Sequence, residues 1–492
     1  MSLPRISAAD RAFFADVARV VYENPFSTRR AERIVRLAPG AVLGDLTNDP
    51  RALYRVVWPR VEPLVRAGPA AIAALSAQDR QLVEPTFLYV CFHRAVPHLD
   101  ALINKQAAQG GAPLPVTFSE EVIGDFMRCG FSEEHARRYF SLIFQMRRGF
   151  LFIEGDLRGA CDSMRALREA LWNNIFTHDM RGFEAALWNR MEDFSTLLLG
   201  ETGTGKGAVA RAIGRSVFIP YDAARGRFAA NFTETFIAIN LSQFPESLIE
   251  SELFGHRKGA FTGAIEHHEG VFEHCNEHGA LFLDEIGEVS VPVQIKLLQV
   301  LQERTYTQVG GREKKRFGGR VIAATNQSLG ALRREGRFRN DFFYRLCSDV
   351  IEVPTLRQRI AESEAELEQL VRLVVARIAG AEVPELVTRV LEALEASLPR
   401  GYPWPGNVRE LEQAVRRILL TGRYAGEFAP APGGEEEALL EKMRAGELTA
   451  DELLARYSAL LYRRLGSYAE VAKRTGLDPR TARKYVESAK AD

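Results

Sequence analysis

The chain has 492 residues, more than one hydrophobic core usually organises, so we expect several domains. Lys and Arg number 64 and so do Asp and Glu, which excludes a global charge that would favour nucleic acids or membranes, and any basic surface must be local. No apolar run approaches the roughly 20 residues of a membrane span, and no signal peptide is evident, so we expect a cytoplasmic protein without membrane contact. The five cysteines form no CxxC pair, which is typical of reduced thiols.

Residues 1–176 are predicted to form a helical regulatory region. Ser7 and Asp10 have the spacing of a helix-capping box, apolar residues at helical spacing follow them, and similar stripes recur further along. The region shows no alternating strand pattern and no internal repeat. We expect it to respond to an effector, whose chemistry no motif identifies.

Two clusters in this region have both a functional and a plainer interpretation. The first comprises Cys91, His93, His98 and Asp100. Their side chains can bind metal ions, but their spacing fits one face of a helix poorly, so ordinary helix residues are the better interpretation. The second comprises Arg137, Arg138, Arg147 and Arg148. It could bind an anionic effector, although a solvated helix face is the better interpretation.

A phosphate-binding loop is predicted at residues 197–206, where an apolar, strand-like run enters a glycine-rich turn before a helix-prone segment. The glycines let backbone N–H groups converge on phosphate oxygens, and Lys206 is placed to reach the β- and γ-phosphates of a nucleotide. Gly207 stands where Ser or Thr usually binds magnesium, so the metal needs another ligand. The predicted nucleotide-binding residues of the loop are Gly200, Glu201, Thr202, Gly203, Thr204, Gly205, Lys206 and Gly207.

Three further apolar strands end in polar residues. The first ends in Asp284 and Glu285: Asp284 can hold Mg²⁺ directly or through water, and Glu285 can polarise the attacking water. The second ends in Asn326, which is suited to orienting that water or sensing the γ-phosphate, and the third in Asn240, within plausible reach of Glu285. Strands that alternate with helical segments predict a parallel α/β sheet with its ligand at the carboxyl ends of the strands.

The segment 252–264 is a glycine-rich loop with an aromatic residue near its tip. Gly255, Gly259 and Gly263 permit sharp turns, and Phe261 stands between small residues. An exposed aromatic side chain on such a loop favours a contact with another molecule, while a buried turn is the alternative.

Residues 195–425 resemble the AAA+ ATPase domain of bacterial enhancer-binding proteins, which activate sigma-54 RNA polymerase. The motifs that carry the resemblance lie at residues 200–206, 250–255, 259–264, 283–287, 324–326, 336–346 and 402–411. The resemblance implies an ATPase that uses ATP and Mg²⁺ in a ring oligomer, expected to be a hexamer. It also identifies the sigma-54-contacting GAFTGA loop as Gly259, Ala260, Phe261, Thr262, Gly263 and Ala264.

The resemblance assigns roles to further residues. Arg339 and Arg345 are similar to arginine fingers that enter a neighbouring subunit's nucleotide site, although the residues alone are equally well explained as surface charges. Arg409 matches the sensor arginine of the helical lid, Asn326 the first sensor, and Asn240 with Glu285 the nucleotide-coupled switch. The chain departs from the family at Gly207, where Glu is usual, in an acidic start to the lid near residue 361, and in two segments, 221–234 and 312–319, that could be tolerated surface insertions.

The C-terminal end resembles a Fis-type helix-turn-helix. Residues 429–437 form a linker rich in Pro, Gly and Glu, and an apolar helical stripe follows. Eight Lys or Arg against three acidic residues between positions 463 and 490 give a local basic field suited to DNA. The candidate contacts to enhancer DNA are Arg480, Thr481, Arg483 and Lys484. A helical hairpin that does not bind DNA is the alternative.

The predicted fold is therefore multidomain. It comprises a helical N-terminal region (1–176), an α/β AAA+ P-loop ATPase subdomain (177–357), a helical lid (358–428), a linker (429–437) and an all-α helix-turn-helix domain (438–492). The predicted function is a sigma-54-dependent activator that binds enhancer DNA and uses ATP hydrolysis in a ring of its own copies to remodel sigma-54 RNA polymerase for promoter opening. The alternatives are a repressor that keeps the AAA+ core for assembly, against which Phe261 and Thr262 argue, and an AAA+ remodeller of another protein, against which the helix-turn-helix argues.

Overall fold

The computed structural model describes residues 6–39, 51–399, 401–424 and 448–488, together with the single positions 426, 439, 443 and 446. It contains two compact units, one made of residues 1–387 with 406–415 and the other of residues 388–405 with 416–492. The predicted linker 429–437 lies outside the described residues. None of the helices that the structure describes is long and apolar enough to cross a membrane.

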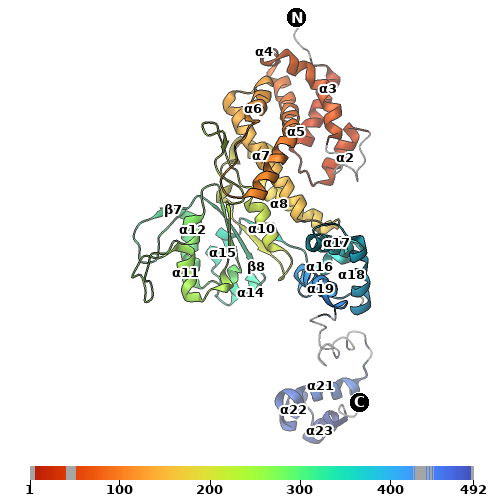
Figure 1. The fold of residues 1–492 in the computed structure, drawn as a ribbon. Helices are drawn as coiled ribbons and strands as arrows, with labels where there is room; N and C mark the ends of the chain where they lie inside the picture. The colour runs from red at the N-terminus through yellow and green to blue at the C-terminus, as the bar shows by residue number, and fades with distance from the viewer. Residues whose placement is uncertain are drawn as a thin grey trace. The chain divides into compact units, whose positions relative to one another are not determined.

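The N-terminal region is built from helices, as predicted. Ser7 accepts a hydrogen bond from the backbone N–H of Asp10 and thereby satisfies one of the free donors at the start of the first helix. The helices are α1 (Ala8–Tyr22), α2 (Thr28–Leu37), α3 (Ala52–Ala67), α4 (Pro69–Ala73), α5 (Ala77–Gln109), α6 (Ser119–Arg128), α7 (Glu133–Asp156), α8 (Asp162–Phe176) and α9 (Met180–Gly182). The long helix α5 packs against α1, α3, α6 and α7 (Figure 1).

The four residues with metal-binding side chains lie along α5, where they make ordinary helix contacts. The His93 ring packs against Tyr89 with centroids 4.2 Å apart. Asp100 accepts both a 2.5 Å and a 2.7 Å hydrogen bond from the guanidinium of Arg147 on α7. These contacts support the interpretation of the cluster as helix residues.

A five-stranded parallel sheet forms the centre of the α/β part, which confirms the predicted fold class. Its strands are β1 (Thr196–Leu199), β4 (Phe236–Asn240), β5 (Ala280–Asp284), β8 (Arg320–Thr325) and β9 (Asp349–Glu352). Their order across the sheet is β4-β5-β8-β1-β9, with β1 paired to both β8 and β9. The carboxyl ends of all five strands therefore meet at one edge, where the predicted polar residues follow them.

Alternate strand residues belong to two hydrophobic cores, one on each face of the sheet. Leu197 and Val321 join the core formed with the helices of one face. Those helices are α11 (Glu246–Phe254), α12 (Val271–His274), α13 (Val291–Glu303), α14 (Leu329–Arg334) and α15 (Asn340–Leu346). Leu198 and Ile322 join a second core that includes α10 (Lys206–Gly214) and continues without a break into the N-terminal helices. The N-terminal region is thus packed onto the α/β part through a common core.

The segment 221–234 contributes to this packing and is not a free surface insertion. It includes a two-stranded hairpin, β2 (Tyr221–Asp222) and β3 (Arg227–Phe228). The ring of Phe228 stacks on Phe144 of α7 with centroids 3.8 Å apart. The hydroxyl of Tyr221 donates a 2.7 Å hydrogen bond to Ser119 Oγ at the start of α6. The hairpin therefore connects the α/β part to α6 and α7.

Arg148 on α7 makes a second connection and corrects the predicted solvated arginine face. Its side chain is 0% exposed, and it donates hydrogen bonds of 2.6 and 2.8 Å to the carbonyl oxygens of Arg215 and Val217, which follow α10. Carbonyl groups at the end of a helix lack partners within the helix and carry partial negative charge, which favours a cation there. Burial lowers the pKa of Arg148 to about 9. The interpretation as a solvated face is wrong for this residue.

The lid and the C-terminal region are helical, as predicted. The lid helices are α16 (Leu356–Glu362), α17 (Ala365–Ala379), α18 (Pro384–Ser397) and α19 (Asn407–Thr421). The C-terminal helices are α21 (Ala450–Leu465), α22 (Tyr468–Thr475) and α23 (Pro479–Ser488), and their small core consists of Leu461, Val471, Ala472, Ala482 and Val486. Gly476 ends α22 with a left-handed φ of 73°, which makes the turn between the two helices of the predicted helix-turn-helix.

Candidate nucleotide-binding site

The glycine-rich loop joins β1 to α10, in the order that the sequence predicts. Gly203 and Gly205 adopt φ values of 81° and 102°, a backbone region that side-chain-bearing residues rarely enter. Lys206 begins α10, and its ammonium group donates hydrogen bonds of 2.8 and 3.2 Å to the carbonyl oxygens of Gly200 and Glu201. The loop is thus wrapped around its own lysine at the amino end of a helix.

The donors of this loop fit the phosphates of a nucleotide. Four backbone N–H groups of the loop donate to no acceptor among the residues that the structure describes. They belong to Gly203, Gly205, Lys206 and Gly207. The amino end of α10 adds positive potential at the same place. Burial lowers the pKa of Lys206, and the nearby charge of Arg409 lowers it further. The carboxylates of Glu285 and Asp284 act in the opposite direction and raise this pKa. A bound phosphate would supply both the missing acceptors and the missing negative charge.

Asp284 and Glu285 follow the central strand β5, at the same edge of the sheet. Glu285 has φ 56° and ψ 49°, a left-handed conformation that costs a non-glycine residue on the order of 1–2 kcal/mol and is typical of functional sites. Its Oε2 accepts a 3.4 Å hydrogen bond from the backbone N–H of Asn326. Burial raises the pKa of Glu285, against which the Asn326 N–H acts. The half-buried carboxyl group is suited to accepting a proton.

Asp284 is the candidate magnesium ligand. Its Oδ1 accepts a 3.1 Å hydrogen bond from the backbone N–H of Glu285. The described residues contain no group of three or more His, Cys, Asp or Glu side chains that could hold a metal ion. One carboxylate is nevertheless compatible with Mg²⁺, because this ion usually keeps several waters and takes further ligands from substrate phosphates.

The two asparagines predicted at strand ends behave differently. Asn326 follows β8 and donates its Nδ2–H to Thr202 Oγ1 at 2.9 Å, which links it directly to the phosphate loop. Asn240 ends β4, opposite Asp284 in the register of the sheet. Its Oδ1 accepts hydrogen bonds from the backbone N–H and the hydroxyl of Ser242 at 3.0 and 2.7 Å, rather than contacting Glu285. The Asn240–Glu285 switch therefore stays a prediction.

The start of the lid helix α19 lies directly against the phosphate loop. The backbone N–H of Arg409 donates to the carbonyl oxygen of Gly203 at 3.3 Å, and a Cβ at Gly203 would collide with the carbonyl oxygen of Gly406. Asn407, with a left-handed φ of 52°, donates its Nδ2–H to the carbonyl oxygen of Thr202 at 3.1 Å. The close approach of α19 explains why the loop needs glycine at position 203.

Sequence reasoning missed Asn407 and Arg357. Arg357 of α16 forms a two-pronged ion pair with Glu201 of the loop, one of whose hydrogen bonds measures 2.8 Å, and Asn407 donates to the same carboxylate at 3.2 Å. These contacts join residues more than 150 positions apart, so no local pattern indicates them. The one available signal is the pair Gly406-Asn407 at a helix start, since asparagine is tolerated in the left-handed region.

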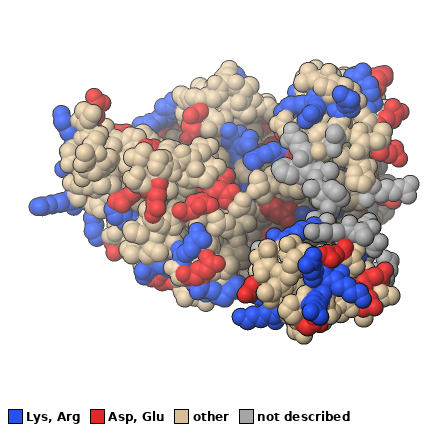
Figure 2. Space-filling view, turned by 90° about the horizontal axis from the view of Figure 1, so that it is seen from below, with Lys and Arg blue, Asp and Glu red and all other residues tan. Residues whose placement is uncertain are grey.

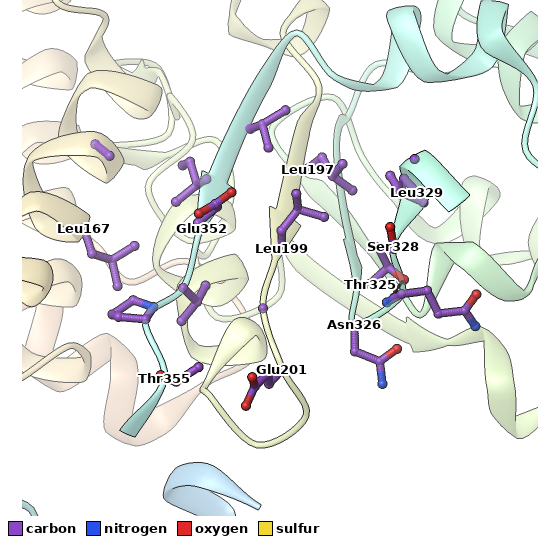
Figure 3. Close-up of a pocket in the computed structure, with 18 of the residues that line it drawn as sticks. Leu167, Leu197, Leu199, Glu201, Thr325, Asn326, Ser328, Leu329, Glu352 and Thr355 are labelled. Atoms are coloured by element: carbon purple, nitrogen blue, oxygen red, sulfur yellow. Dashed lines mark hydrogen bonds between the residues drawn. The ribbon is translucent and has the colours of Figure 1, made fainter. Parts of the chain in front are cut away.

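A cavity of about 980 Å³ opens beside the phosphate loop at the ends of β1, β8 and β9. Figure 3 shows Glu201 and Asn326 where two of these strands end, with Leu167 of α8 on one side. Leu199 and Val353 add to its apolar lining. The cavity combines an apolar wall with polar groups at the strand ends, which is typical of ligand sites.

The two arginines expected to act across subunits both have partners within their own chain. Arg339 pairs in a two-pronged manner with Asp341, at 3.0 and 2.6 Å. Arg345 donates from Nε and Nη2 to the carbonyl oxygen of Leu301, at 2.9 and 2.7 Å. Both lie on or next to α15, and their role in a neighbouring site stays a prediction.

The GAFTGA loop is a closed, exposed loop. The backbone N–H of Gly259 donates to the carbonyl oxygen of Ala264 at 2.8 Å and closes its base. Phe261 is 38% exposed, with its ring centroid 4.9 Å from that of His256 in an edge-to-face arrangement, and Thr262 is exposed. The alternative of a buried turn is wrong for these two residues.

The base of this loop rests on the second hairpin of the α/β part. That hairpin consists of β6 (Thr305–Tyr306) and β7 (Lys315–Arg316). The backbone N–H of Arg257 donates to the carbonyl oxygen of Val309 at 3.1 Å, and a Cβ at Gly310 would lie 2.8 Å from the Cβ of Ala260. Glu313, in the segment 312–319, pairs with the guanidinium of Arg257 at 3.4 Å, so this segment forms part of the support.

The candidate DNA contacts lie on α23. Arg480, Arg483 and Lys484 are exposed, and Thr481 is half-buried. The backbone N–H of Thr481 donates a 3.1 Å hydrogen bond to Asp478 Oδ1, which caps the helix. Arg483 forms a 2.7 Å ion pair with Glu487. Figure 2 shows Lys and Arg side chains gathered on a face of the C-terminal helices, with Asp and Glu side chains beside them.

The parallel sheet, the phosphate loop and the helical lid together define an AAA+-type P-loop nucleotide-binding domain. Residues 180–352 match the family described as the sigma-54 interaction domain. The match confirms the resemblance that the sequence motifs indicated.

The curated relatives are bacterial regulators. The chain is 44% identical over 226 residues to the DNA-binding transcriptional regulator NtrC of Azospirillum brasilense, covering 46% of this chain and 43% of the relative. It is 40% identical over 278 residues to the regulatory protein AtoC of Escherichia coli K12 (53% and 56% covered) and 36% identical over 303 residues to the transcriptional regulatory protein ZraR of the same strain (58% and 62% covered). The chain thus spans about half the length of the relatives it matches.

Among solved structures, NtrX from Brucella abortus in complex with ATP aligns with 75% of this chain and 80% of its own, at 22% identity and a TM-score of 0.40. An identity and a TM-score this low carry no information on the site or on the function of this chain.

Proposed function

We propose that the chain is a sigma-54-dependent transcriptional activator that hydrolyses ATP to remodel sigma-54 RNA polymerase. The observation that carries this proposal is the coexistence, within one sigma-54 interaction domain, of a phosphate loop whose free N–H groups suit a nucleotide and of an exposed GAFTGA loop. Relatives named as transcriptional regulators support it. Such a regulator acts in the cytoplasm, on polymerase bound at DNA.

Each residue of the nucleotide site has a proposed role. The free N–H groups of the loop and Lys206 hold the phosphates, Asp284 holds Mg²⁺, and the cavity beside β9 takes the base and ribose. Bound Mg²⁺ would neutralise charge on the phosphates. Glu285 takes a proton from the attacking water, and Asn326 positions the loop through Thr202.

The rate of ATP hydrolysis is expected to fall as the pH is lowered, at a higher pH than an ordinary glutamate would require. Glu285 must be ionised to accept a proton, and burial raises its pKa above the usual value of about 4.3. A pH profile of kcat at saturating ATP measures this, with circular dichroism at each pH to confirm that the chain stays folded. A rate that stays constant down to the range of an exposed glutamate would contradict the assignment.

We further propose that the nucleotide sites are shared between copies in a ring. Arg345 and Arg339 would leave their present partners Leu301 and Asp341 to enter the neighbouring site, where removal of an arginine finger can lower kcat by roughly 10³–10⁵-fold.

Mixing two inactive variants tests this sharing. Arg345→Ala keeps its own phosphate loop and Lys206→Ala keeps its finger, so an equimolar mixture is expected to recover about a quarter of the wild-type ATPase rate if subunits mix at random. Each variant alone stays inactive. A mixture no faster than the separate variants, or full activity of Arg345→Ala alone, would show that each site is complete within one chain.

Thr262→Ala is expected to uncouple the ATPase from polymerase. The residue is exposed on a loop closed by its own backbone hydrogen bonds, so its loss should leave hydrolysis within about twofold of wild type. Open-complex formation by sigma-54 RNA polymerase should fall at least about tenfold. ATPase and open-complex assays are run side by side with Glu266→Gln, an exposed control just outside the motif.

Two outcomes would redirect the proposal. Equal loss of both activities in Thr262→Ala would make the loop a structural element. Failure of the wild-type chain to form open complexes with ATP would favour a repressor that uses the AAA+ domain for assembly.

The remaining assignments complete the proposal. We propose that Arg480, Thr481, Arg483 and Lys484 contact enhancer DNA. The predicted divisions 1–176, 177–357, 358–428 and 438–492 are proposed as the regulatory region, the ATPase subdomain, the lid and the DNA-binding domain. Footprinting on DNA that carries candidate enhancers checks the first of these, because the absence of any protected site would favour a remodeller of another protein.

A further inference from the structure

A second cavity lies within the N-terminal helical bundle, apart from the nucleotide site. Its volume is about 480 Å³, and α3, α5 and α6 contribute its walls. Small-molecule sites usually measure roughly 300–1,000 Å³ and combine apolar walls with a few convergent polar groups. Ala95 and Val122 supply apolar walls here, and both are buried. The size and the lining are those of a site for a small organic molecule.

The charges around this cavity leave a small positive excess. Three guanidinium groups line it, from Arg51, Arg55 and Arg94, against the two carboxylates of Glu121 and Asp125.

Asp125 does not balance the charge of Arg51, because its own charge is already engaged. It is buried and forms ion pairs with Arg94, at 3.3 Å, and with Arg128. Arg51 forms no ion pair with any residue that the structure describes. A single negative charge on a ligand would therefore meet an uncompensated guanidinium, and a guanidinium binds a carboxylate through two parallel hydrogen bonds.

Aromatic rings line the same cavity. Tyr54 and His93 both face it, and their ring centroids lie 6.2 Å apart. Burial lowers the pKa of His93 to about 3, so its ring is uncharged at neutral pH and adds no competing cation. Flat rings beside an arginine favour a flat ligand, since aromatic faces stack and guanidinium planes pack on them.

We propose that this cavity binds a small planar organic monoanion, of the aromatic carboxylate class, with Arg51 as its main charge partner. The role of this cavity as an effector site rests on the function proposed above, whereas the binding of a ligand in the cavity does not.

The position of the cavity explains how occupancy would reach the ATP site. Val122 and Asp125 belong to α6, whose Phe126 packs on Tyr139 of α7 with ring centroids 5.8 Å apart. The same helix α7 carries Arg148, which binds the carbonyl oxygens that follow α10, and α10 begins at Lys206. A ligand that shifts α6 therefore acts on a continuous set of packed helices that ends at the phosphate loop.

Calorimetric titration of the full chain with benzoate and with 2-naphthoate tests the site. We expect saturable binding of one molecule per chain, weakened about tenfold or more in Arg51→Gln, because hydrogen bonds to charged groups are the strong ones. Arg66→Gln is the matched control: Arg66 lies on α3, the helix that Arg51 directly precedes, is exposed, pairs with Glu62 and does not line the cavity, so this variant should bind as wild type. Benzamide, which has the same shape without the charge, and cyclohexanecarboxylate, which has the charge without the flat ring, should both bind at least about tenfold more weakly.

Each outcome of the titrations tests a different part of the proposal. Absence of saturable binding by both aromatic carboxylates, or equal affinity in wild type and Arg51→Gln, overturns the site. Equal affinity for benzamide overturns the charge argument, and tighter binding of inorganic phosphate than of either carboxylate overturns the ligand class.

ATP turnover tests the effector role separately. Saturating ligand should change the turnover of wild type and Arg66→Gln but not that of Arg51→Gln. Binding without any change in turnover overturns the effector role. Absence of ATP hydrolysis in every sample instead counts against the proposed function, while the titration still decides the site.

Discussion

Replacing Glu285 with glutamine is expected to slow ATP hydrolysis by roughly 10²–10⁴-fold, the contribution typical of a general base. The amide has nearly the same shape as the carboxyl group, but it cannot take a proton from water. The backbone strain at position 285 is unchanged, because glutamine and glutamate have similar backbone preferences. Phosphate release at saturating ATP measures the rate, and binding of a fluorescent ATP analogue checks that the nucleotide still binds.

Glu288→Gln is the control for this variant. Glu288 lies one turn further along, is exposed, and accepts a hydrogen bond from Gln327 rather than facing the phosphate loop. We expect it to hydrolyse ATP within about twofold of wild type. If both variants lose activity alike, the loss reflects the negative potential of the region, and Glu285 has no specific role.

Much of the site could be predicted because its chemically important residues lie in short segments with recognisable local patterns. Lys206 follows a glycine-rich turn, and Asp284 and Glu285 end an apolar run, so each segment predicts both its own conformation and its function. Parallel strands bring such ends together whatever the intervening sequence, because their carboxyl ends share one edge of the sheet. The sheet and the meeting of these residues therefore followed from pattern alone.

The parts that could not be predicted depend on contacts between distant segments. Arg148 has the same local pattern as its exposed neighbour Arg137, yet one is fully buried and the other pairs with Glu133 at the surface. The difference arises because α10 ends beside Arg148 and presents its free carbonyl groups. Spacing within α7 carries no information on where α10 ends.

The same reason applies to the segment 221–234. By length it is a surface insertion, but Phe228 packs on Phe144 and the hairpin closes the core shared by the N-terminal helices and the sheet. A regulatory region joined by a flexible linker could move without disturbing the ATPase, whereas one that shares its core cannot. Regulation in this chain is therefore expected to act through small shifts of packed helices.

Arg148→Met is expected to loosen the helix that carries Lys206. Methionine preserves much of the length and apolar contact of the side chain, but the carbonyl oxygens of Arg215 and Val217 lose their donors. Each unsatisfied buried group costs about 1–3 kcal/mol, and release of the buried charge from its desolvation cost offsets part of this, so we expect a net loss of roughly 2–4 kcal/mol. Hydrogen exchange followed by mass spectrometry should show faster exchange across residues 206–217, with weaker nucleotide binding.

Arg137→Met separates this effect from a general loss of charge on α7. Arg137 is exposed and paired with Glu133 one turn away, and such a pair contributes roughly 0.3–0.5 kcal/mol, so its loss should leave exchange in α10 unchanged. The helix-turn-helix residues 448–488 have their own core and should exchange at the wild-type rate in both variants. Unchanged exchange of residues 206–217 in Arg148→Met would mean that α10 is held by its apolar face alone. In that case the guanidinium would contribute nothing to the connection between the N-terminal helices and the phosphate loop.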